Sequence, residues 1–405
     1  VAAGLGTVEK NHLLVRYSGQ FSVEKLNDTK QLEQNKDIFV QVHEFEAGEI
    51  TRAYEPYLTM ICDGFRRYMT GTFEDFMEAC DVYDLHRPVL LGYFNQDYAK
   101  REEIILLDEV AYEQERMLAA LERMLCAIAD RHPILLILNR FQLAPKSTMQ
   151  LTARLLKIEN CNIGLVLGVS DIQAMPEFLV PDWEMLYETL DDGSKIYHIG
   201  NSGRKKEEIA EDEKYIDYGS EKVYRKLQNM VEFLDFDQAA YYLETIERKI
   251  KFDNLLVDDA ARFRMCLLFV KVSILRQDIP KALEICEDLE KIHLAGKEEE
   301  CAYEQDYLIA TAYMYQGKLK EALEVAGETY RIAGKMSDDY RMFLSELLEA
   351  KIQMSGWYNI FFCAQDVKIK ESLIQNLIRY NYRNHLAHVY IYAYDNKPEI
   401  VEKAN

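Results

Sequence analysis

The chain has 405 residues, of which 49% are hydrophobic and 29% charged, and its formal net charge is −21 at pH 7. This length predicts two or three domains that each bury a core. The negative charge argues against broad nucleic-acid binding, because phosphate contacts need clustered lysine and arginine, and no apolar run approaches the roughly eighteen residues that indicate a membrane span.

After a short tail at residues 1–7, residues 8–200 alternate between strand-like and helical patterns, including an amphipathic helix at 113–130. This alternation predicts a parallel sheet with crossover helices, and hence an α/β domain. A turn signal at residues 190–195 leaves a small hairpin as an alternative for the last strand. The candidate strands cover residues 12–17, 38–45, 133–139, 162–169 and 195–199.

A degenerate phosphate-binding loop follows the first candidate strand. Such a loop needs glycines whose amides face the phosphates, then a lysine, then a hydroxyl for magnesium. Gly19 and Lys25 have the expected separation, but Glu24 stands where a second glycine is expected and Leu26 replaces the hydroxyl. Triphosphate binding in the usual mode should therefore be weak or absent. Taken alone, the glycine and lysine fit a turn and a solvated surface equally well.

The apolar segment Pro133–Asn139 predicts a strand buried on both faces. It ends where a nucleotide hydrolase places its magnesium-binding acid, and here that residue is Asn139. An amide carries no negative charge, so magnesium lacks its usual protein ligand. The pattern thus predicts a nucleotide-binding architecture with little or no hydrolysis.

A second acidic pair leaves an alternative open. Ile104–Leu107 followed by Asp108 and Glu109 has the form of an intact strand that ends in a metal ligand and a base. These acids would restore an active ATPase. The favoured interpretation is one continuous helix over residues 104–124, with both acids exposed.

Residues 201–220 have a mixed charge run that predicts a linker or a solvated helix. Helical periodicity dominates residues 221–405. Within residues 301–333, Ala310, Gly317 and Ala322 fall on the small positions of a tetratricopeptide helix pair. The spacing from Ala282 to Ala322 is about forty residues, longer than the usual period of about 34. The segment is therefore expected to be a tetratricopeptide-like helical solenoid.

Other chemistry-bearing residues are weaker candidates. His385 and His388 share a predicted helical face, but no third ligand accompanies them, so packing is expected rather than a metal site. No serine or cysteine occupies a nucleophile elbow. Eight scattered cysteines without a CxxC pair indicate a reducing, cytoplasmic setting.

Residues 8–200 resemble the STAND class of P-loop signalling ATPases, an AAA-like group, in the branch of large transcriptional regulators related to the maltose regulator. Four segments carry the resemblance in order: the loop with Gly19 and Lys25, the aromatic–proline segment 53–58, the strand and following residues 135–142, and the strand 163–170. Asn139 and Arg140 replace both acids of the family pattern. The resemblance implies an ATPase domain that switches between closed and open states, and a helical superhelix that receives an inducer or partner.

The resulting expectation is a signalling or transcription-regulatory protein with a non-catalytic, pseudo-ATPase domain and a helical-repeat domain that binds a protein, a peptide or a small effector. The degenerate pocket would contain Gly19, Ser22, Lys25 and Asn139. No cofactor is expected, with ATP or ADP in the altered pocket as the alternative, and the protein could self-associate. Two alternatives to this expectation stay open: an active ATPase that uses Asp108 and Glu109, and a scaffold that binds no nucleotide. A DNA-binding domain would have to lie beyond this segment.

Overall fold

The computed structural model describes residues 12–17, 38–46, 48–97, 109–158, 161–169, 175–191, 195–199, 217–252, 257–355 and 371–396. These divide into two compact units. The first contains the described residues up to 218 together with 222–242, and the second contains 219–221 and the described residues from 243 onward. The tail predicted at 1–7 and residues 201–216 of the predicted linker lie outside the described residues.

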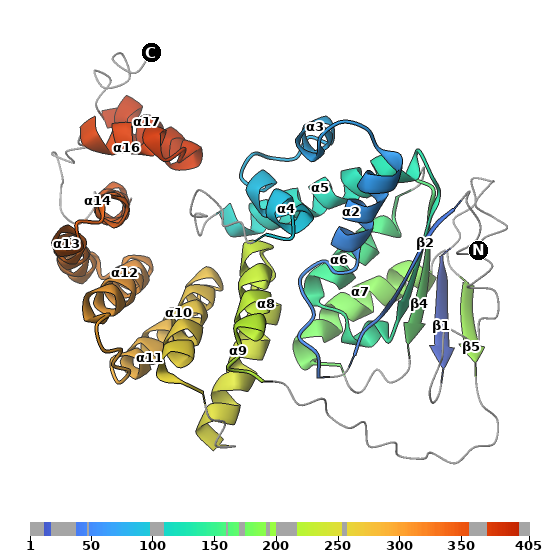
Figure 1. Cartoon of the computed structure of the whole chain (residues 1–405), viewed down its shortest axis with the longest axis horizontal. Coiled ribbons are helices and arrows are strands. Elements are labelled where there is room, and N and C mark those ends of the chain that lie inside the picture. The colour runs from blue at the N-terminus through green and yellow to red at the C-terminus, as the bar shows by residue number, and fades with distance from the viewer. Residues whose placement is uncertain are drawn as a thin grey trace. The chain divides into compact units, whose positions relative to one another are not determined.

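The first unit contains a five-stranded parallel sheet (Figure 1). Its order is β2-β3-β4-β1-β5, and every pairing is parallel. All five predicted strands are confirmed, and the hairpin alternative is wrong because β5 pairs in parallel with β1. β3 and β4 are buried along their whole length, which explains their continuous apolar runs. The strands are β1 Leu13–Tyr17, β2 Phe39–Glu44, β3 Ile134–Asn139, β4 Ile163–Val169 and β5 Lys195–Ile199.

Helices cover this sheet, and the predicted amphipathic helix at 113–130 is confirmed as α5. α5 contacts both α2 and α6, and α6 contacts α7. Buried apolar residues of α2 and α5 face one another, which joins the two helices into one core. The helices of this unit are α2 Tyr57–Tyr68, α3 Phe73–Ala79, α4 Arg87–Phe94, α5 Val110–Ala129, α6 Lys146–Leu155, α7 Val180–Asp191, α8 Glu221–Glu232 and the beginning of α9 Phe236–Phe252.

The described residues of the second unit are helical, as predicted for this half of the chain. Helix ends carry local signals: Asp278 caps α11, Asp338 caps α14, and Gly317 ends α12 with a φ of 80° that glycine adopts without strain. Successive helices contact one another, and α12 also contacts α10 and α14. After α9 come α10 Asp259–Leu275, α11 Ile279–Leu289, α12 Glu298–Gln316, α13 Leu319–Met336, α14 Asp339–Met354, α16 Glu371–Arg379 and α17 Arg383–Asn396.

The boundary between the units differs from the prediction. The helical periodicity from residue 221 onward assigns residues 222–242 to the helical repeats, but they belong to the first compact unit. The physical reason is a set of polar contacts with that unit, including the Lys226–Glu49 ion pair at 2.8 Å and a hydrogen bond from the Ser147 backbone N–H to Asp235 at 3.1 Å. Among the described helices, none has the length and apolar character needed to cross a membrane.

Candidate functional site

Asn139 ends β3 at the carboxyl edge of the sheet, beside Glu44 at the end of β2. Its side chain is only 1% exposed, and its amide nitrogen has no hydrogen-bond partner among the described residues. Arg140 then takes the left-handed conformation, with a φ of 52°, and turns the chain away from the strand. A buried donor without an acceptor is costly, so an acceptor brought to this edge would stabilise the site.

The structure describes only part of the predicted site. Gly19, Ser22 and Lys25 lie outside the described residues, although β1, which precedes them, lies between β4 and β5. Of the alternative acidic pair, Asp108 also lies outside them, and Glu109 is the residue that precedes α5. Glu109 is not part of the five-stranded sheet.

Asp235 joins α9 to the carboxyl edge of the sheet. Its carboxylate accepts hydrogen bonds from the backbone N–H groups of Ser147 at 3.1 Å and Gln238 at 3.4 Å, so it caps the first turns of both α6 and α9. The Ser147 hydroxyl in turn accepts from the backbone N–H of Tyr54 at 3.1 Å. Asp235 is 4% exposed, and burial raises its pKa to about 6 against the opposing effect of these hydrogen bonds.

Lys146, at the first position of α6, reinforces this connection. Its ammonium group donates to Asp237 and lies 3.9 Å from Asp182. Partial burial acts to lower the pKa of Lys146, but the surrounding carboxylates outweigh it and raise the pKa overall. The first turn of α6 is therefore held to α9 by a charged contact as well as by backbone hydrogen bonds.

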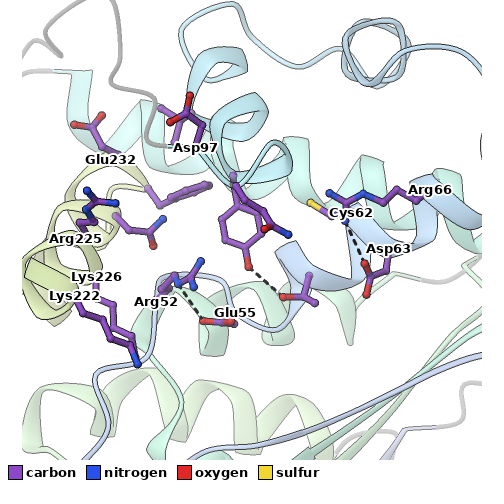
Figure 2. A pocket seen from close by; sticks show the side chains of 16 residues that line it. Arg52, Glu55, Cys62, Asp63, Arg66, Asp97, Lys222, Arg225, Lys226 and Glu232 are labelled. Atoms are coloured by element: carbon purple, nitrogen blue, oxygen red, sulfur yellow. Dashed lines mark hydrogen bonds and ion pairs between the residues drawn. The ribbon is translucent and has the colours of Figure 1, made fainter. Parts of the chain in front are cut away.

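A cavity of about 570 Å³ lies beside α8. Its walls come from residues 52–66 at the start of α2, from residues 89–97 around the end of α4, and from α8 itself (Figure 2). Five basic side chains line it: Arg52, Arg66, Lys222, Arg225 and Lys226. Four acidic side chains also line it: Glu55, Asp63, Asp97 and Glu232.

Part of this charge is already paired. Arg66 lies 3.4 Å from Asp63 and donates to the backbone oxygen of Phe94 at 2.7 Å. Lys226 pairs with Glu49 at 2.8 Å, outside the cavity lining. The hydroxyls of Tyr93 and Thr59, which both line the cavity, share a hydrogen bond of 3.1 Å.

The cavity is suited to binding rather than to covalent chemistry. Burial raises the pKa of Cys62 to about 12, so its thiol stays protonated and is a poor nucleophile. Burial likewise raises the pKa of Tyr93 to about 12, with the nearby Glu55 carboxylate adding to the shift. Within the described part of the chain, no three His, Cys, Asp or Glu residues are placed to hold a metal ion.

The histidine pair named in the sequence lies in the second unit. His385 is buried beside Tyr382, while His388 is exposed.

Sequence reasoning did not identify this cavity. Lys222, Arg225 and Lys226 lie at spacings of three and four, which puts three cations on one face of a helix. That spacing was the available signal, but the helical periodicity assigns α8 to the helical repeats.

Comparisons of this chain with protein-family models, with curated proteins and with solved structures give no match.

Proposed function

We propose that the chain is a STAND-like signalling protein whose α/β unit binds a nucleotide without hydrolysing it. The observation that carries this proposal is the side chain of Asn139 at the end of β3, a buried amide donor without an acceptor among the described residues. A phosphate oxygen would accept a hydrogen bond from this amide. A neutral amide cannot replace the carboxylate that usually helps to hold magnesium, so binding is favoured over hydrolysis.

The sheet order supports the same proposal. Parallel strands present their carboxyl ends at one edge, where ligands of open α/β sheets bind. β1 and β3 both pair in parallel with β4, so β1 ends, at Tyr17, at the same edge of the sheet as Asn139. The proposal takes Gly19, Ser22 and Lys25, which follow β1 in sequence, as the other half of the nucleotide site. Lys25 would then supply the positive charge for the phosphates, while Asn139 supplies a neutral donor.

The helical half is proposed to be a tetratricopeptide-like solenoid that receives a protein, a peptide or a small effector. Ala310 and Ala322 are fully buried in one core cluster of α12, α13 and α14, where small side chains let helices approach closely. The additional contacts of α12 with α10 and α14 are the kind that stacked repeats make. A cytoplasmic regulator built this way would take its DNA-binding part, if it has one, from outside this segment.

Thermal unfolding with ATP or ADP, each with and without magnesium, tests the nucleotide proposal. A ligand that binds only the folded state raises the unfolding temperature. We expect a shift of a few degrees that needs no magnesium and that disappears in Lys25→Ala. In Asn139→Asp the shift should shrink without magnesium, because a carboxylate repels phosphate, and should recover when magnesium is added.

Two outcomes would contradict the proposal in different ways. Magnesium-dependent ATP turnover that is lost in Asp108→Asn/Glu109→Gln would show an active ATPase that uses the alternative acids. No shift at millimolar nucleotide would show that the α/β unit is a scaffold, and the search for a ligand would move to the helical half.

A further inference from the structure

The cavity beside α8 has an uneven distribution of charge within a strongly acidic chain. α8 directs Lys222, Arg225 and Lys226 toward it from one helical face. Figure 2 shows these side chains on the side of the cavity where Arg52 also lies, whereas Arg66 and Asp63 lie at the opposite end. Neighbouring like charges on one helix face destabilise it. Glu49 already offsets part of this repulsion at Lys226, and an anion beside Lys222 would offset more of it.

Two polar groups of the cavity are available to a ligand. Lys222 makes no hydrogen bond or ion pair with any residue that the structure describes, and the side-chain oxygen of Asn229 is buried without a donor among those residues. Both belong to α8, seven positions apart, and therefore lie on the same face. The ion pair between Arg52 and Glu55 is long, at 3.9 Å, and the Arg52 side chain is 45% exposed.

We propose that this cavity binds a small phosphorylated metabolite that also bears hydroxyl groups, the class to which sugar phosphates belong. Lys222 and Arg52 would bind the phosphate, since charge-assisted hydrogen bonds are the strongest available there. A ligand hydroxyl would donate to the Asn229 oxygen. The volume of about 570 Å³ is in the range of small-molecule sites, and the Tyr93 and Phe233 rings supply an apolar wall.

Such a ligand would also strengthen the attachment of α8 to the first unit. The cavity walls come from α2 and α4 on one side and α8 on the other, so a bound anion contacts both. This site is separate from Asn139, which is not among the described residues that line the cavity.

The experiment measures thermal unfolding and calorimetric binding of the full chain with glucose 6-phosphate, inorganic phosphate, glucose and sodium chloride at matched ionic strength. Glucose 6-phosphate should raise the unfolding temperature by about 3 °C at roughly ten times its Kd. Lys222→Ala should raise that Kd at least about tenfold. Lys335→Ala removes an equally exposed lysine from α13 and should leave the Kd unchanged.

Several outcomes would overturn the site. The proposal is wrong if sodium chloride or glucose raises the unfolding temperature as much as glucose 6-phosphate does. It is also wrong if Lys222→Ala and Lys335→Ala bind glucose 6-phosphate equally well. A shift that disappears in Lys25→Ala but survives in Lys222→Ala would show that the phosphate binds at the loop after β1. This result would contradict the site beside α8 and would be consistent with the nucleotide proposal. Because Lys222 is exposed, its substitution should not alter folding, and unfolding without ligand checks this.

A separate observation concerns two cysteines of the same unit. The Cys161 thiol, just before β4, donates to the sulfur of Cys126 on α5, and the two sulfur atoms are 2.8 Å apart. That separation is only about 0.8 Å longer than a disulfide bond. Both residues are half-buried, so a small oxidant can reach them. The hydrogen bond from Cys161 lowers the pKa of Cys126, which favours its reactive thiolate.

We infer that Cys126 and Cys161 form a site of reversible oxidation by hydroperoxides. The Cys126 thiolate attacks one peroxide oxygen and breaks the O–O bond, which gives a sulfenic acid and hydroxide. The hydroxide takes up the proton that the Cys126 thiol released and leaves as the first water. The Cys161 sulfur then attacks the Cys126 sulfur, a second water leaves, and a disulfide forms. Overall, two thiols and one hydrogen peroxide give one disulfide and two waters.

Peptide mapping under non-reducing conditions after hydrogen peroxide treatment tests this inference on the full chain. A Cys126–Cys161 cross-link that dithiothreitol removes is expected, and Cys161→Ser should leave sulfenic acid on Cys126 instead. Cys301→Ser, at a half-buried thiol elsewhere, should retain the cross-link. Oxidation of Cys126 without a cross-link, or a cross-link to the buried Cys80 instead, would contradict the pairing.

Discussion

Asp235 illustrates how one side chain joins distant parts of the first unit. Its two oxygens accept backbone N–H groups at the starts of α6 and α9, so the same carboxylate satisfies donors that each helix leaves unpaired. The favourable position of an anion at two helix N-termini competes with the cost of burying it. The cost of burial is the larger of the two effects, and as a result the pKa of Asp235 is raised to about 6 rather than lowered.

This pKa makes the stability of the first unit depend on pH at Asp235. The folded state takes up the Asp235 proton near pH 6 and the unfolded chain only near 3.8, so the contribution to stability is fully present at low pH and is lost as pH rises through about 6. The advantage of the wild type over Asp235→Asn should be about 1.4 kcal/mol larger at about pH 5 than at about pH 7.5.

Urea unfolding at the two pH values measures this difference. Asp75→Asn is the matched control, because hydrogen bonds from Thr72 lower the pKa of Asp75, which then stays ionised across this range. An identical gap between the wild type and Asp235→Asn at both pH values would mean that Asp235 is ionised throughout.

At the scale of elements, α2 packs closely against both α5 and the sheet. A methyl group added at Gly64 would lie 2.8 Å from a methyl carbon of Ile128 on α5 and 3.1 Å from the ring of Phe39 on β2. A real side chain does not fit at such a separation without movement of its neighbours. The absence of a side chain at Gly64 therefore sets the distance between these elements. Gly334, in α13, has nothing within 4 Å of the same position.

The two glycines should respond to alanine in opposite ways. Gly64→Ala should lower the free energy of unfolding by about 1–3 kcal/mol, because it overpacks the contact between α2, α5 and β2. Gly334→Ala should raise it by about 0.5–1 kcal/mol, because alanine restricts the unfolded chain and favours the helix. Urea unfolding followed by circular dichroism distinguishes the signs, and destabilisation by both changes would contradict the packing described for α13.

For the whole molecule, the first unit needs a segment that follows its sheet in sequence. α8 and the start of α9 bury Leu227, Met230 and Phe233 and also supply Asp235 and Lys226. The sheet and its preceding helices consequently form an incomplete surface without residues 222–242.

Truncation tests this dependence. A fragment of residues 1–252 keeps the whole of α9 and should unfold in one cooperative transition. A fragment of residues 1–217 loses α8 and Asp235, and should be less stable by at least about 3 kcal/mol because it exposes apolar surface and leaves the Ser147 amide unpaired. Equal denaturation midpoints for the two fragments would show that α8 and α9 contribute nothing to the first unit.

The sequence by itself determined the five strands, helix α5 and the helical character of the second half. These follow from local periodicity, since a strand buried on both faces must be apolar throughout and an amphipathic helix must repeat its apolar face. Asn139 was also identified from the sequence, because it is the last residue of such a strand. Gly19, Ser22 and Lys25 lie outside the described residues, so the loop stays a prediction.

Only the tertiary structure decided where α8 and α9 belong, how Asp235 is used and where the charged cavity lies. Asp235 and Ser147 are 88 residues apart in the chain, and Lys226 and Glu49 are 177 apart. No local pattern records such pairings: the same helical periodicity fits packing against a repeat or against a sheet domain. The strand order was equally undetermined, because parallel strands of similar apolar character differ little in local sequence and the order depends on which of them meet in the folded unit.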